Sequence, residues 1–482
     1  MEEAAARHGT AVPRGQRPDA DLELPDGRFG RMFPKRKACD VSDEAIAEMV
    51  SWMGDPARSQ PSNPRIPAGF TYLGQFIDHD ITFDPVSKLD RLADPKALRN
   101  FRTPRLDLDS VYGSGPVAQP FLYDWKDTEP AGTRLLIGRN EVDELPRNQQ
   151  GRALIGDMRN DENAIVAQLH LLFIRFHNAV VDWLCRNGDV PERDELFDHA
   201  QRIVRWHYQW IVLHEFLPAV VGDGIAGEVM VADDDGGVRE VRCTYFEWPD
   251  DAQPFIPVEF SGAAYRFGHS MARADYGLKR IPKGAGIVAE AARTVPLFPD
   301  LAGFTWLRES LVIDWERFFA LPGADHPPQP SQKIDSSLVK PLFNLPEDPA
   351  NRGLARRNLR RGRVLRLPSG QEVADAMEED PLSEEELQLE HMPRSRDELK
   401  AATPLWYYIL CETSRAVDAD GRPQPGEHLG PVGGRIVAEV IAGLMEADRS
   451  SYLHEDGWKP ELGRNGTFTM GDLVKIAQEG VQ

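Results

Sequence analysis

The sequence predicts a mainly α-helical protein with long loops and little β-structure. Apolar residues recur at helical spacing over several turns in three stretches, 162–185, 195–221 and 430–447. Runs in which apolar and polar residues alternate, as they do in half-buried strands, are few, and no repeat is apparent. A chain of 482 residues can form two or three ordinary domains or one large one. We expect one dominant helical body with a loose arm.

The arm is predicted at the N-terminus. Residues 1 to about 68 are rich in Gly, Pro, Arg and Asp and show little periodicity. We therefore expect 1–68 to form an extended segment that wraps the body, which would comprise 69–482. One short helix is predicted within the arm near 41–50, where Ser42 can act as the N-cap and Glu44 lies in the first turn.

The remaining stretches are predicted from composition and spacing. Residues 85–150 contain recurring Pro and Gly and should be rich in loops. Apolar spacing predicts further helices at 260–272 and 303–321. The stretch 377–390 holds seven acidic residues with Ser383 as a candidate N-cap, and we expect it to form a solvated helix face.

The charge balance bears on possible partners. The chain carries 56 Lys and Arg against 77 Asp and Glu, a net charge of −21. This balance argues against a general nucleic-acid binder, because phosphate contacts need clustered cations, and it disfavours docking on anionic membranes. No run approaches the ~18 apolar residues that a membrane-spanning helix needs. A soluble protein is the resulting expectation, and the oligomeric state is not predicted.

Cysteine usage and the N-terminal residues bear on the compartment. Cys39, Cys185, Cys243 and Cys411 are scattered and form no C-x-x-C pair, which argues against a zinc knuckle or a disulfide scaffold. The first ten residues contain two acids and no apolar segment, unlike a secretory signal. A cytoplasmic location is the default expectation, with non-classical export left open.

The stretch GQFIDHDITFDP is the first candidate site. It places Asp78, His79, Asp80 and Asp84 among apolar residues, and a soluble protein rarely buries such charges without partners. His79 alone is compatible with a histidine satisfied by neighbouring carboxylates or with a metal ligand. A mononuclear metal site would need more His ligands at suitable spacing.

Two pairs of histidines lie on the two long predicted helices. His170 and His177 are seven residues apart, as are His207 and His214. Seven residues are about two turns, so the members of each pair share a face but lie ~10 Å apart. That separation is too large for one ion, and we expect these histidines to make hydrogen bonds in the core or at an interface.

A second acidic cluster lies in the stretch FRTPRLDLDSVYGSG. It offers Thr103, Asp107, Asp109 and the backbone carbonyl of Arg105. Alternating oxygen donors in an extended loop suit a hard cation with roughly six to eight oxygen ligands, above all Ca²⁺. Asp80 is available as a further carboxylate. An ordinary Asp-rich turn is the alternative.

Arg159 and Glu162 directly precede the long helix at 162–185. An arginine at a helix start opposes the helix dipole, so another interaction should favour it. An ion pair with Asp157 or Asp161 is one explanation.

Two more stretches combine unusual residues. His269 lies in the aromatic stretch YRFGHSM, where a histidine is ordinarily a packed core residue. The stretch ARRNLRRGRVLR, residues 355–366, carries six arginines in an acidic chain. It would either contact nucleic acid, which nothing else in the sequence supports, or surround a buried anion.

Taken in order, these motifs resemble the peroxidase–cyclooxygenase superfamily, the animal-type haem peroxidases of the myeloperoxidase and lactoperoxidase kind. The matching stretches are GQFIDHD, LDLDSVYGS, GDMRNDE followed by LHLLFIRFHN, YRFGH and NLRRGR, which run from 74 to 363. The stretches GRFGRMFP and VGGRIVAEVIAGLMEAD are similar to those of short bacterial members. The resemblance implies a single large helical haem-peroxidase domain with haem b and Ca²⁺.

The implied activity is the use of hydrogen peroxide, through a ferryl intermediate, to oxidise halides, thiocyanate or small aromatic donors. Position by position, His79 matches the distal histidine, Arg159 the distal arginine and Gln75 the distal glutamine. His269 matches the proximal ligand of the haem iron, and Asn358 the residue that hydrogen-bonds the other nitrogen of that ligand.

The resemblance also implies how the haem is held. Arg266 and Arg361 match arginines on the propionate side, and Asp78 and Glu162 match carboxylates that become ester-linked to haem methyl groups. Myeloperoxidase follows its ester-forming Glu with a Met that adds a sulfonium link, whereas this chain has Asn163. We therefore expect two esters without the third link.

The same resemblance implies a calcium shell. Asp80, Thr103, Arg105 through its carbonyl, Asp107 and Asp109 match its ligands. Asp109 stands where the mammalian enzymes have Ser, which would add a negative charge to the site.

Two rival functions remain open. A fatty-acid dioxygenase of the same superfamily needs a Tyr three positions before the proximal histidine, where this chain has Arg266, and Tyr265 lies one position further back. A non-catalytic structural or adhesion-type relative is the other rival, and the matched distal and proximal residues argue against it.

Overall fold

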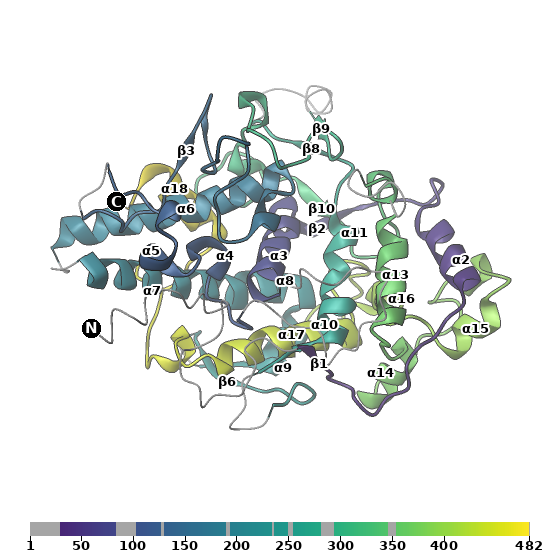
Figure 1. Cartoon of the computed structure of the whole chain (residues 1–482). Helices are drawn as coiled ribbons and strands as arrows, with labels where there is room; N and C mark the ends of the chain where they lie inside the picture. The colour runs from purple at the N-terminus through teal and green to yellow at the C-terminus, as the bar shows by residue number, and fades with distance from the viewer. Residues whose placement is uncertain are drawn as a thin grey trace, which may run out of the picture.

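Helices dominate the computed structural model, and the strands of its described residues pair in twos (Figure 1). The structure describes residues 29–82, 103–126, 130–188, 193–233, 236–248, 254–280, 294–345 and 353–481. Asp84 and the first 28 residues of the predicted arm lie outside these ranges. The mainly α-helical class predicted from apolar spacing is confirmed within them.

The longest helix, α6 (Ala164–Asn187), runs through the core, as the apolar spacing of 162–185 predicts. The side chain of Asn163 caps its start by accepting hydrogen bonds from two backbone N–H groups, and Gly188 ends it at φ 73°. By length and composition alone α6 is long and apolar enough to span a membrane, which the sequence reading missed. However, 89% of its apolar window is buried inside the protein, as in a core helix.

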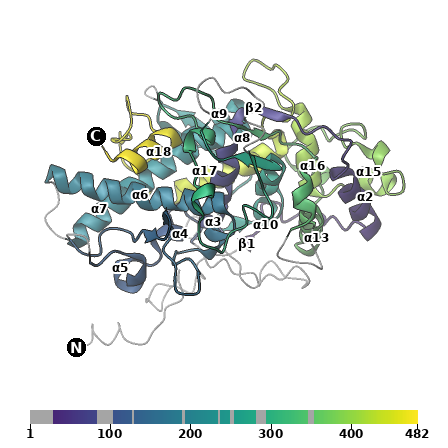
Figure 2. The same ribbon diagram turned by 90° about the horizontal axis from the view of Figure 1, so that it is seen from above.

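Helix α6 packs against α3 (Ala68–Ile81), α7 (Arg193–Ile211) and α18 (Met470–Glu479) (Figures 1 and 2). Phe76 of α3 stacks on Phe173 of α6 with 4.6 Å between ring centroids. Gly69 permits a close approach of α3 to the loop at Phe318, because a Cβ there would lie 2.5 Å from the Phe318 carbonyl oxygen. Helix α3 is therefore held on several sides.

The predicted helix 195–221 forms with a π turn in its middle. Helix α7 passes into the π turn at Val212–Phe216 and then into α8 (Leu217–Val221). Pro218 has no N–H to donate to a carbonyl one turn earlier, and a widened turn accommodates that loss.

Helix α17 (Pro431–Ala447) confirms the predicted helix at 430–447. The buried carboxylate of Glu412, at the end of α16 (Leu405–Glu412), accepts hydrogen bonds from Val432 N at 3.0 Å and Gly433 N at 3.1 Å. Burial raises the pKa of Glu412 to about 7. The two helices are thereby joined end to end through a cap.

Shorter helices complete the body. They are α4 (Asp109–Tyr112), α5 (Gly115–Ala118), α9 (Asp223–Val229), α10 (Val258–Gly262), α11 (Gly268–Met271), α13 (Leu354–Val364), α14 (Gly370–Ala376) and α15 (Arg396–Ala401). The predicted helix at 260–272 is broken into α10, a 3₁₀ turn at Ala264–Phe267 and α11, because Ala263 leaves helical geometry at φ −138° and ψ −70°.

The described strands form five two-stranded sheets. The one parallel pair among them is β1 (Phe29–Gly30) with β7 (Ile256–Pro257). The antiparallel pairs are β2 (Ser62–Pro67) with β10 (Pro330–Gln332), β3 (Gly138–Arg139) with β4 (Asp143–Glu144), β5 (Met230–Ala232) with β6 (Val238–Val241), and β8 (Asp275–Gly277) with β9 (Thr294–Pro296).

The described part of the predicted arm contains the expected short helix. Helix α2 (Asp43–Met53) begins after Ser42, whose side chain accepts a hydrogen bond from Ala45 N. It packs against α13, and Arg363 of that helix pairs with Asp43 at 2.9 Å. The division of the chain at residue 68 stays a prediction.

The predicted helix at 303–321 is wrong. The segment forms only two 3₁₀ turns, at Glu309–Leu311 and Trp315–Arg317. Its first backbone N–H groups form hydrogen bonds outside the segment. Gly303 N donates to the Glu162 carbonyl at 3.0 Å, and Phe304 N donates to the Asp161 carbonyl at 2.7 Å. Pairing with the residues before α6 therefore replaces helix formation.

The acidic stretch 377–390 also differs from its prediction. Ser383 does cap a turn, because its hydroxyl accepts a hydrogen bond from Glu386 N at 3.2 Å. The residues after it form turns rather than a regular helix. Their acids are paired, Glu386 with Arg415 at 2.5 Å and Glu384 with Arg396 at 2.6 Å.

Candidate functional site

Helix α3 presents polar side chains to two different sides. Gln75, Asp78 and His79 lie three and four residues apart and therefore share one face of the helix. All three line the same cavity. Asp80 points elsewhere, where its carboxylate accepts hydrogen bonds from Leu108 N at 3.0 Å and Ser110 N at 3.3 Å.

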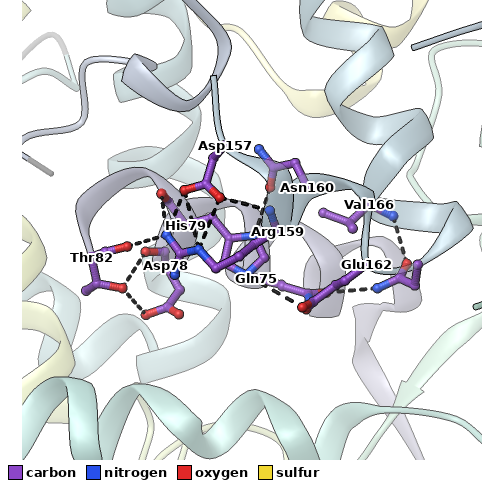
Figure 3. A network of polar contacts seen from close by, with 10 residues as sticks. Gln75, Asp78, His79, Thr82, Asp157, Arg159, Asn160, Glu162 and Val166 are labelled. Carbon is purple, nitrogen blue, oxygen red and sulfur yellow. Dashed lines mark hydrogen bonds and ion pairs between the residues drawn. The ribbon is translucent and has the colours of Figure 1, made fainter. Parts of the chain in front are cut away.

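His79 is buried and held by an asparagine (Figure 3). Its Nδ1 lies 2.8 Å from Oδ1 of Asn160, an atom that can only accept, so Nδ1 carries the proton. Nδ2 of Asn160 in turn donates to Nδ1 of His170 at 3.0 Å. Burial, and next the positive charge of Arg159, lower the pKa of His79 to about 4. His79 is therefore neutral at pH 7, with an unprotonated Nε2.

Arg159 is fixed beside His79 by several hydrogen bonds (Figure 3). Its Nη2 donates to Asp157 Oδ2 at 2.9 Å and to the backbone carbonyl of His79 at 3.0 Å, and also to the carbonyl of Thr82. Of the two ion pairs left open by the sequence, the structure has the one with Asp157. The guanidinium thus joins the end of α3 to the turn before α6.

Asp161 has a different partner, the buried Arg147. The guanidinium of Arg147 binds both oxygens of Asp161, at 2.6 and 2.7 Å, and donates from Nε to Glu144 at 2.9 Å. The side chains of all three are at most 3% exposed. This buried ion network fixes the turn that carries Arg159 and Asn160.

Glu162 completes the polar group around His79. Its Oε1 lies 3.9 Å from His79 Nε2 and accepts a hydrogen bond from Gln75 Nε2 (Figure 3). Asn163 donates to Gln75 Oε1 at 3.3 Å, so it positions Gln75 as well as capping α6. The structure therefore brings Gln75, His79, Arg159 and Glu162 together, as the sequence predicts.

His269 of α11 lies on the same cavity. Its Nδ1 is 2.8 Å from Nδ2 of Asn358 on α13, the pair that the sequence predicts. Burial, and next the positive charge of Arg266, lower the pKa of His269 to about 3, so the ring is neutral. Arg266 is held by a hydrogen bond from Nε to the Ser261 carbonyl at 2.8 Å.

The cavity between these groups has a volume of about 550 Å³. Pockets for cofactors and small ligands commonly measure roughly 300–1,000 Å³ and combine apolar walls with a few polar groups. The polar lining consists of Thr71, Gln75, Asp78, His79, Arg159, Glu162, Asn163, Tyr265, Arg266, His269 and Arg357, and most of the other lining residues are apolar or aromatic.

The donor chemistry of this lining fits a haem. A neutral imidazole is a haem-iron ligand, and a hydrogen bond from its second nitrogen fixes the tautomer. For His269 to ligate through Nε2, its Nδ1 must donate to Oδ1 of Asn358, which requires the amide of Asn358 to turn by 180°. Arg266 and Arg357 supply positive charge on the cavity wall for anionic groups.

Arg361, the predicted propionate partner, is not among the lining residues, whereas Arg357 is. The two positions lie one turn apart on α13. The sequence offered six arginines in this stretch and no means of choosing between them. Asn160 was likewise missed as the partner of His79, because a contact between residues about 80 positions apart leaves no local pattern.

Tyr265 is a further polar residue of the lining. Its hydroxyl is buried and has no hydrogen-bond partner within the described ranges. The side chain is 7% exposed and stacks on Phe260 with 4.6 Å between ring centroids. A buried hydroxyl without a partner is costly and marks a place where a ligand can contribute one.

The predicted calcium residues form a second cluster, on the other side of α3. Thr103 Oγ1 donates to Asp107 Oδ2 at 2.7 Å, and Asp109 N donates to Asp107 Oδ1 at 3.0 Å. Burial, and next the charges of Asp109 and Asp80, raise the pKa of Asp107 well above its usual range. Arg105 N donates to the Thr103 carbonyl at 2.8 Å, so its own carbonyl belongs to the same turn.

The chemistry of this second cluster suits a hard cation, because its donors are oxygens and its carboxylates repel one another. The side chains do not converge on one point as the ligands of a bound metal would. Within the described ranges, no three His, Cys, Asp or Glu side chains lie close enough together to hold a metal ion. The oxygens of Asp80 are engaged by backbone N–H groups instead.

The two histidine pairs of the long helices make core hydrogen bonds, as expected. The contacts are His170 Nδ1 with Asn160, His177 Nε2 with the Thr133 carbonyl at 2.8 Å, His207 Nδ1 with the Ile203 carbonyl at 2.7 Å and His214 Nε2 with the Tyr452 hydroxyl at 2.9 Å.

Comparison with known proteins identifies the family. Residues 87–449 match the family model described as animal haem peroxidase, which is well over half of the chain. The chain belongs to the animal haem peroxidase family. It is 26% identical over 389 residues to the chorion peroxidase of Drosophila melanogaster, covering 77% of this chain and 44% of that protein. It is 25% identical over 308 residues to human thyroid peroxidase, covering 57% of this chain and 30% of that protein.

Solved structures share the fold of this chain. Peroxidase A from Dictyostelium discoideum aligns with a TM-score of 0.64 and 16% identity, covering 95% of this chain and 93% of that one. A fatty acid α-dioxygenase from Oryza sativa aligns with the same TM-score and 15% identity, covering 95% and 80%. The chain spans less than half the length of the chorion and thyroid peroxidases.

Proposed function

We propose that this animal haem peroxidase uses hydrogen peroxide to oxidise small donors, namely halides, thiocyanate or aromatic compounds. The observation that carries the proposal is one cavity lined both by a neutral His79 and by His269, which is paired with Asn358. Membership of the family implies a haem. The haem, when bound, would supply the redox chemistry that couples peroxide reduction to donor oxidation.

His79 would move the peroxide proton. With Nδ1 donating to Asn160, the basic Nε2 is directed away from that bond and stands 3.9 Å from Glu162. It would accept a proton from the peroxide oxygen that attacks and return it to the oxygen that leaves as water. A pKa of about 4 keeps Nε2 unprotonated over the physiological range.

Arg159 would stabilise the negative charge that develops on the leaving oxygen. Its guanidinium is cationic at every relevant pH, and its bonds to Asp157 and to the His79 carbonyl fix it before the substrate arrives. Gln75 and Glu162 are hydrogen-bonded to each other at the same wall, where Gln75 would orient the bound water, peroxide or halide.

His269 would hold the haem iron through Nε2, with Nδ1 donating to Asn358. Arg266 and Arg357 line the cavity and would pair with the propionates, whereas Arg361 is not among the lining residues. Asp78 and Glu162 lie on the cavity wall, and we propose that each forms an ester with a haem methyl group. Asn163 offers no sulfur, so no sulfonium link would form.

We further propose that Ca²⁺ binds at the loop that carries Thr103, Asp107 and Asp109, together with Asp80 and the carbonyl of Arg105. A cation would neutralise the carboxylate repulsion that, after burial, raises the pKa of Asp107. Because Asp80 follows His79 directly on α3, cation binding would also fix the helix that carries His79.

A fatty-acid dioxygenase is the second candidate, and Tyr265 favours it. Its hydroxyl lies buried on the cavity wall without a partner within the described ranges, where a redox-active phenol could act on a bound substrate. Against it, Tyr265 lies four positions before His269 rather than three.

The deciding experiment compares these activities on one preparation. The chain is reconstituted with haem, and its absorption spectrum is recorded before peroxide is added with iodide, bromide, chloride, thiocyanate or a phenol. We expect a Soret band and peroxide-dependent oxidation of at least one donor. His79→Ala should retain the Soret band but slow the reaction with peroxide by about 10²–10⁴-fold, whereas His391→Ala, an exposed histidine, serves as the control.

Linoleate with oxygen and no added peroxide tests the alternative. Rapid oxygen uptake that Tyr265→Phe abolishes would favour the dioxygenase. The absence of a Soret band after reconstitution would contradict both assignments.

A further inference from the structure

The segment at 301–304 is clamped to the residues that carry the polar groups of the cavity. Ala164 N donates to the Leu301 carbonyl at 2.9 Å, and Gly303 and Phe304 donate to the carbonyls of Glu162 and Asp161. Only glycine fits at 303, because a Cβ there would lie 1.8 Å from the Asp161 carbonyl oxygen. The position of Phe304 is thus set by the same turn that carries Arg159 and Glu162.

Phe304 is unusual in two respects. Its backbone has a φ of 58°, in the left-handed region that non-glycine residues rarely occupy. Its side chain lines the cavity and yet is 41% exposed, whereas large apolar side chains are normally covered. Strained backbone of this kind persists where the surrounding structure fixes it and clusters at functional sites.

Arg152 lies over the ring of Phe304. Its guanidinium carbon is 5.6 Å from the centre of the Phe304 ring, and the residue is exposed. Over the described part of the chain its guanidinium has no carboxylate within ion-pair distance, unlike the neighbouring Arg147, which binds Asp161 and Glu144. One cation at this rim is therefore available to an incoming anion.

Two other large apolar side chains are exposed on the segments that carry Phe304 and Arg159. Trp306 is 40% exposed and packs beside Gly151, and Met158 is 58% exposed on the turn that also carries Arg159. Phe304 is the member of this group that also lines the cavity, so it lies where the cavity meets the exterior.

We propose that Phe304 and Arg152 form the recognition site for small aromatic donors that carry a carboxylate, such as phenolic acids. The donor ring would stack on Phe304, and its carboxylate would accept hydrogen bonds from the guanidinium of Arg152. This inference rests on the proposed peroxidase function and names its substrate class. Iodide has neither the ring nor the carboxylate. An uncharged phenol lacks the carboxylate, and a fatty acid lacks the aromatic ring with its phenolic group.

The chemistry balances with peroxide as the oxidant. Each of two phenolic donors gives one electron and its phenolic proton, and hydrogen peroxide takes up both electrons and both protons. The O–O bond breaks, two O–H bonds form, and the products are two phenoxyl radicals and two water molecules. No further reductant or oxidant is needed.

The test measures specificity on the haem-loaded protein with 4-hydroxybenzoate, phenol and iodide. In Arg152→Gln the ratio of kcat/KM for 4-hydroxybenzoate to that for phenol should fall about tenfold, since a charge-assisted hydrogen bond is lost. Arg152→Lys should restore part of it. In Phe304→Leu the ratio of either aromatic donor to iodide should fall severalfold, with the change in KM rather than in kcat.

Matched controls are Phe121→Leu and Arg239→Gln, which alter an aromatic residue that is 50% exposed and an exposed arginine on other elements. Both should leave these ratios unchanged. Saturation-transfer NMR of 4-hydroxybenzoate gives a second readout that needs no turnover, and its signal should weaken in Arg152→Gln and in Phe304→Leu.

Several results would overturn the assignment. Ratios of kcat/KM between donors that stay unchanged in both Arg152→Gln and Phe304→Leu would do so. An equal loss of kcat/KM with all three donors would do so as well. Displacement of 4-hydroxybenzoate by palmitate, with palmitate oxidised, would assign the rim to fatty acids instead. Donor binding in NMR without oxidation of any donor would retain the rim and refute the peroxidase function, so the two failures can be told apart.

Discussion

His79 Nδ1 donates its proton to Oδ1 of Asn160 at 2.8 Å, and Nδ2 of Asn160 donates to His170 Nδ1 at 3.0 Å. The asparagine therefore selects which nitrogen of His79 is basic. It does so without adding charge, so burial and Arg159 keep the pKa of His79 at about 4. A carboxylate at the same position would act differently.

Asn160→Asp tests this relationship. A carboxylate that accepts from Nδ1 would stabilise the imidazolium and raise the pKa of His79, by about one unit or more. His79 acts unprotonated, so the wild-type rate with peroxide should stay constant above about pH 5 and fall as the pH drops through about 4. In the variant this fall should occur at higher pH. Stopped-flow rates across the pH range measure it, with Asn178→Asp, whose side chain binds Leu135 backbone, as the control. An unshifted profile would exclude Asn160 as the positioning residue.

Arg159→Ala should slow the peroxide-dependent change in the haem spectrum by about 10²–10³-fold, because a fixed cation at the leaving oxygen is lost. The spectrum before peroxide should change little. Arg159→Lys keeps the charge but loses the paired bonds to Asp157, so it should recover only part of the rate. Arg175→Ala, which removes a half-buried arginine paired with Asp143, is the control. Wild-type kinetics in Arg159→Ala would remove the proposed role.

The proposed esters predict that haem stays with the polypeptide after denaturation and acidic organic extraction of peroxide-treated protein. Each of the single variants, Asp78→Asn and Glu162→Gln, should retain one ester between the polypeptide and the haem. The double variant should release all the haem. Mass spectrometry of haem peptides would locate the bonds, with the exposed Asp182→Asn as the control. Complete extraction from the treated wild type would refute both esters.

Calcium binding predicts that Ca²⁺ changes which of two proteins, the wild type or Asp107→Asn, is the more stable. With Ca²⁺ at about a hundredfold excess over its Kd, the free energy of unfolding should rise by roughly 2–3 kcal/mol, and a chelator should reverse the gain. Asp107→Asn keeps the hydrogen bonds from Thr103 and Asp109 N but removes a buried charge beside Asp109 and Asp80. It should therefore be more stable than wild type in chelator and indifferent to Ca²⁺. A wild-type protein that does not respond to Ca²⁺ would contradict the site.

The sequence predicted the helical body well because its long helices carry their own apolar spacing, as α6 and α17 do. It failed at 303–321, where the same spacing occurs but the N–H groups of Gly303 and Phe304 bond to residues about 140 positions earlier. The spacing of apolar residues within a segment contains no information about hydrogen bonds to residues so far away in the chain.

The candidate site divides in the same way. His79, Arg159, Glu162, His269 and Asn358 came from motifs and lie together in the structure. Asn160 and Arg357 did not, because their roles depend on which face of a turn or helix meets the cavity. A choice between Arg357 and Arg361 needs the orientation of α13, which tertiary packing sets.

Asp78, His79 and Asp80 follow one another on α3, where the first two line the cavity and Asp80 faces the acidic cluster on the other side. Successive residues of an α-helix are rotated by about 100°, so their positions on one helix fix the directions of the three side chains relative to one another. Deleting a single residue between Pro67 and Asp78 would turn all three together, moving His79 off Asn160 and Asp80 off Leu108 at once. Evolution can therefore exchange the side chains of this helix one at a time, but it cannot change the helix's length by one residue without losing every assignment in the same step.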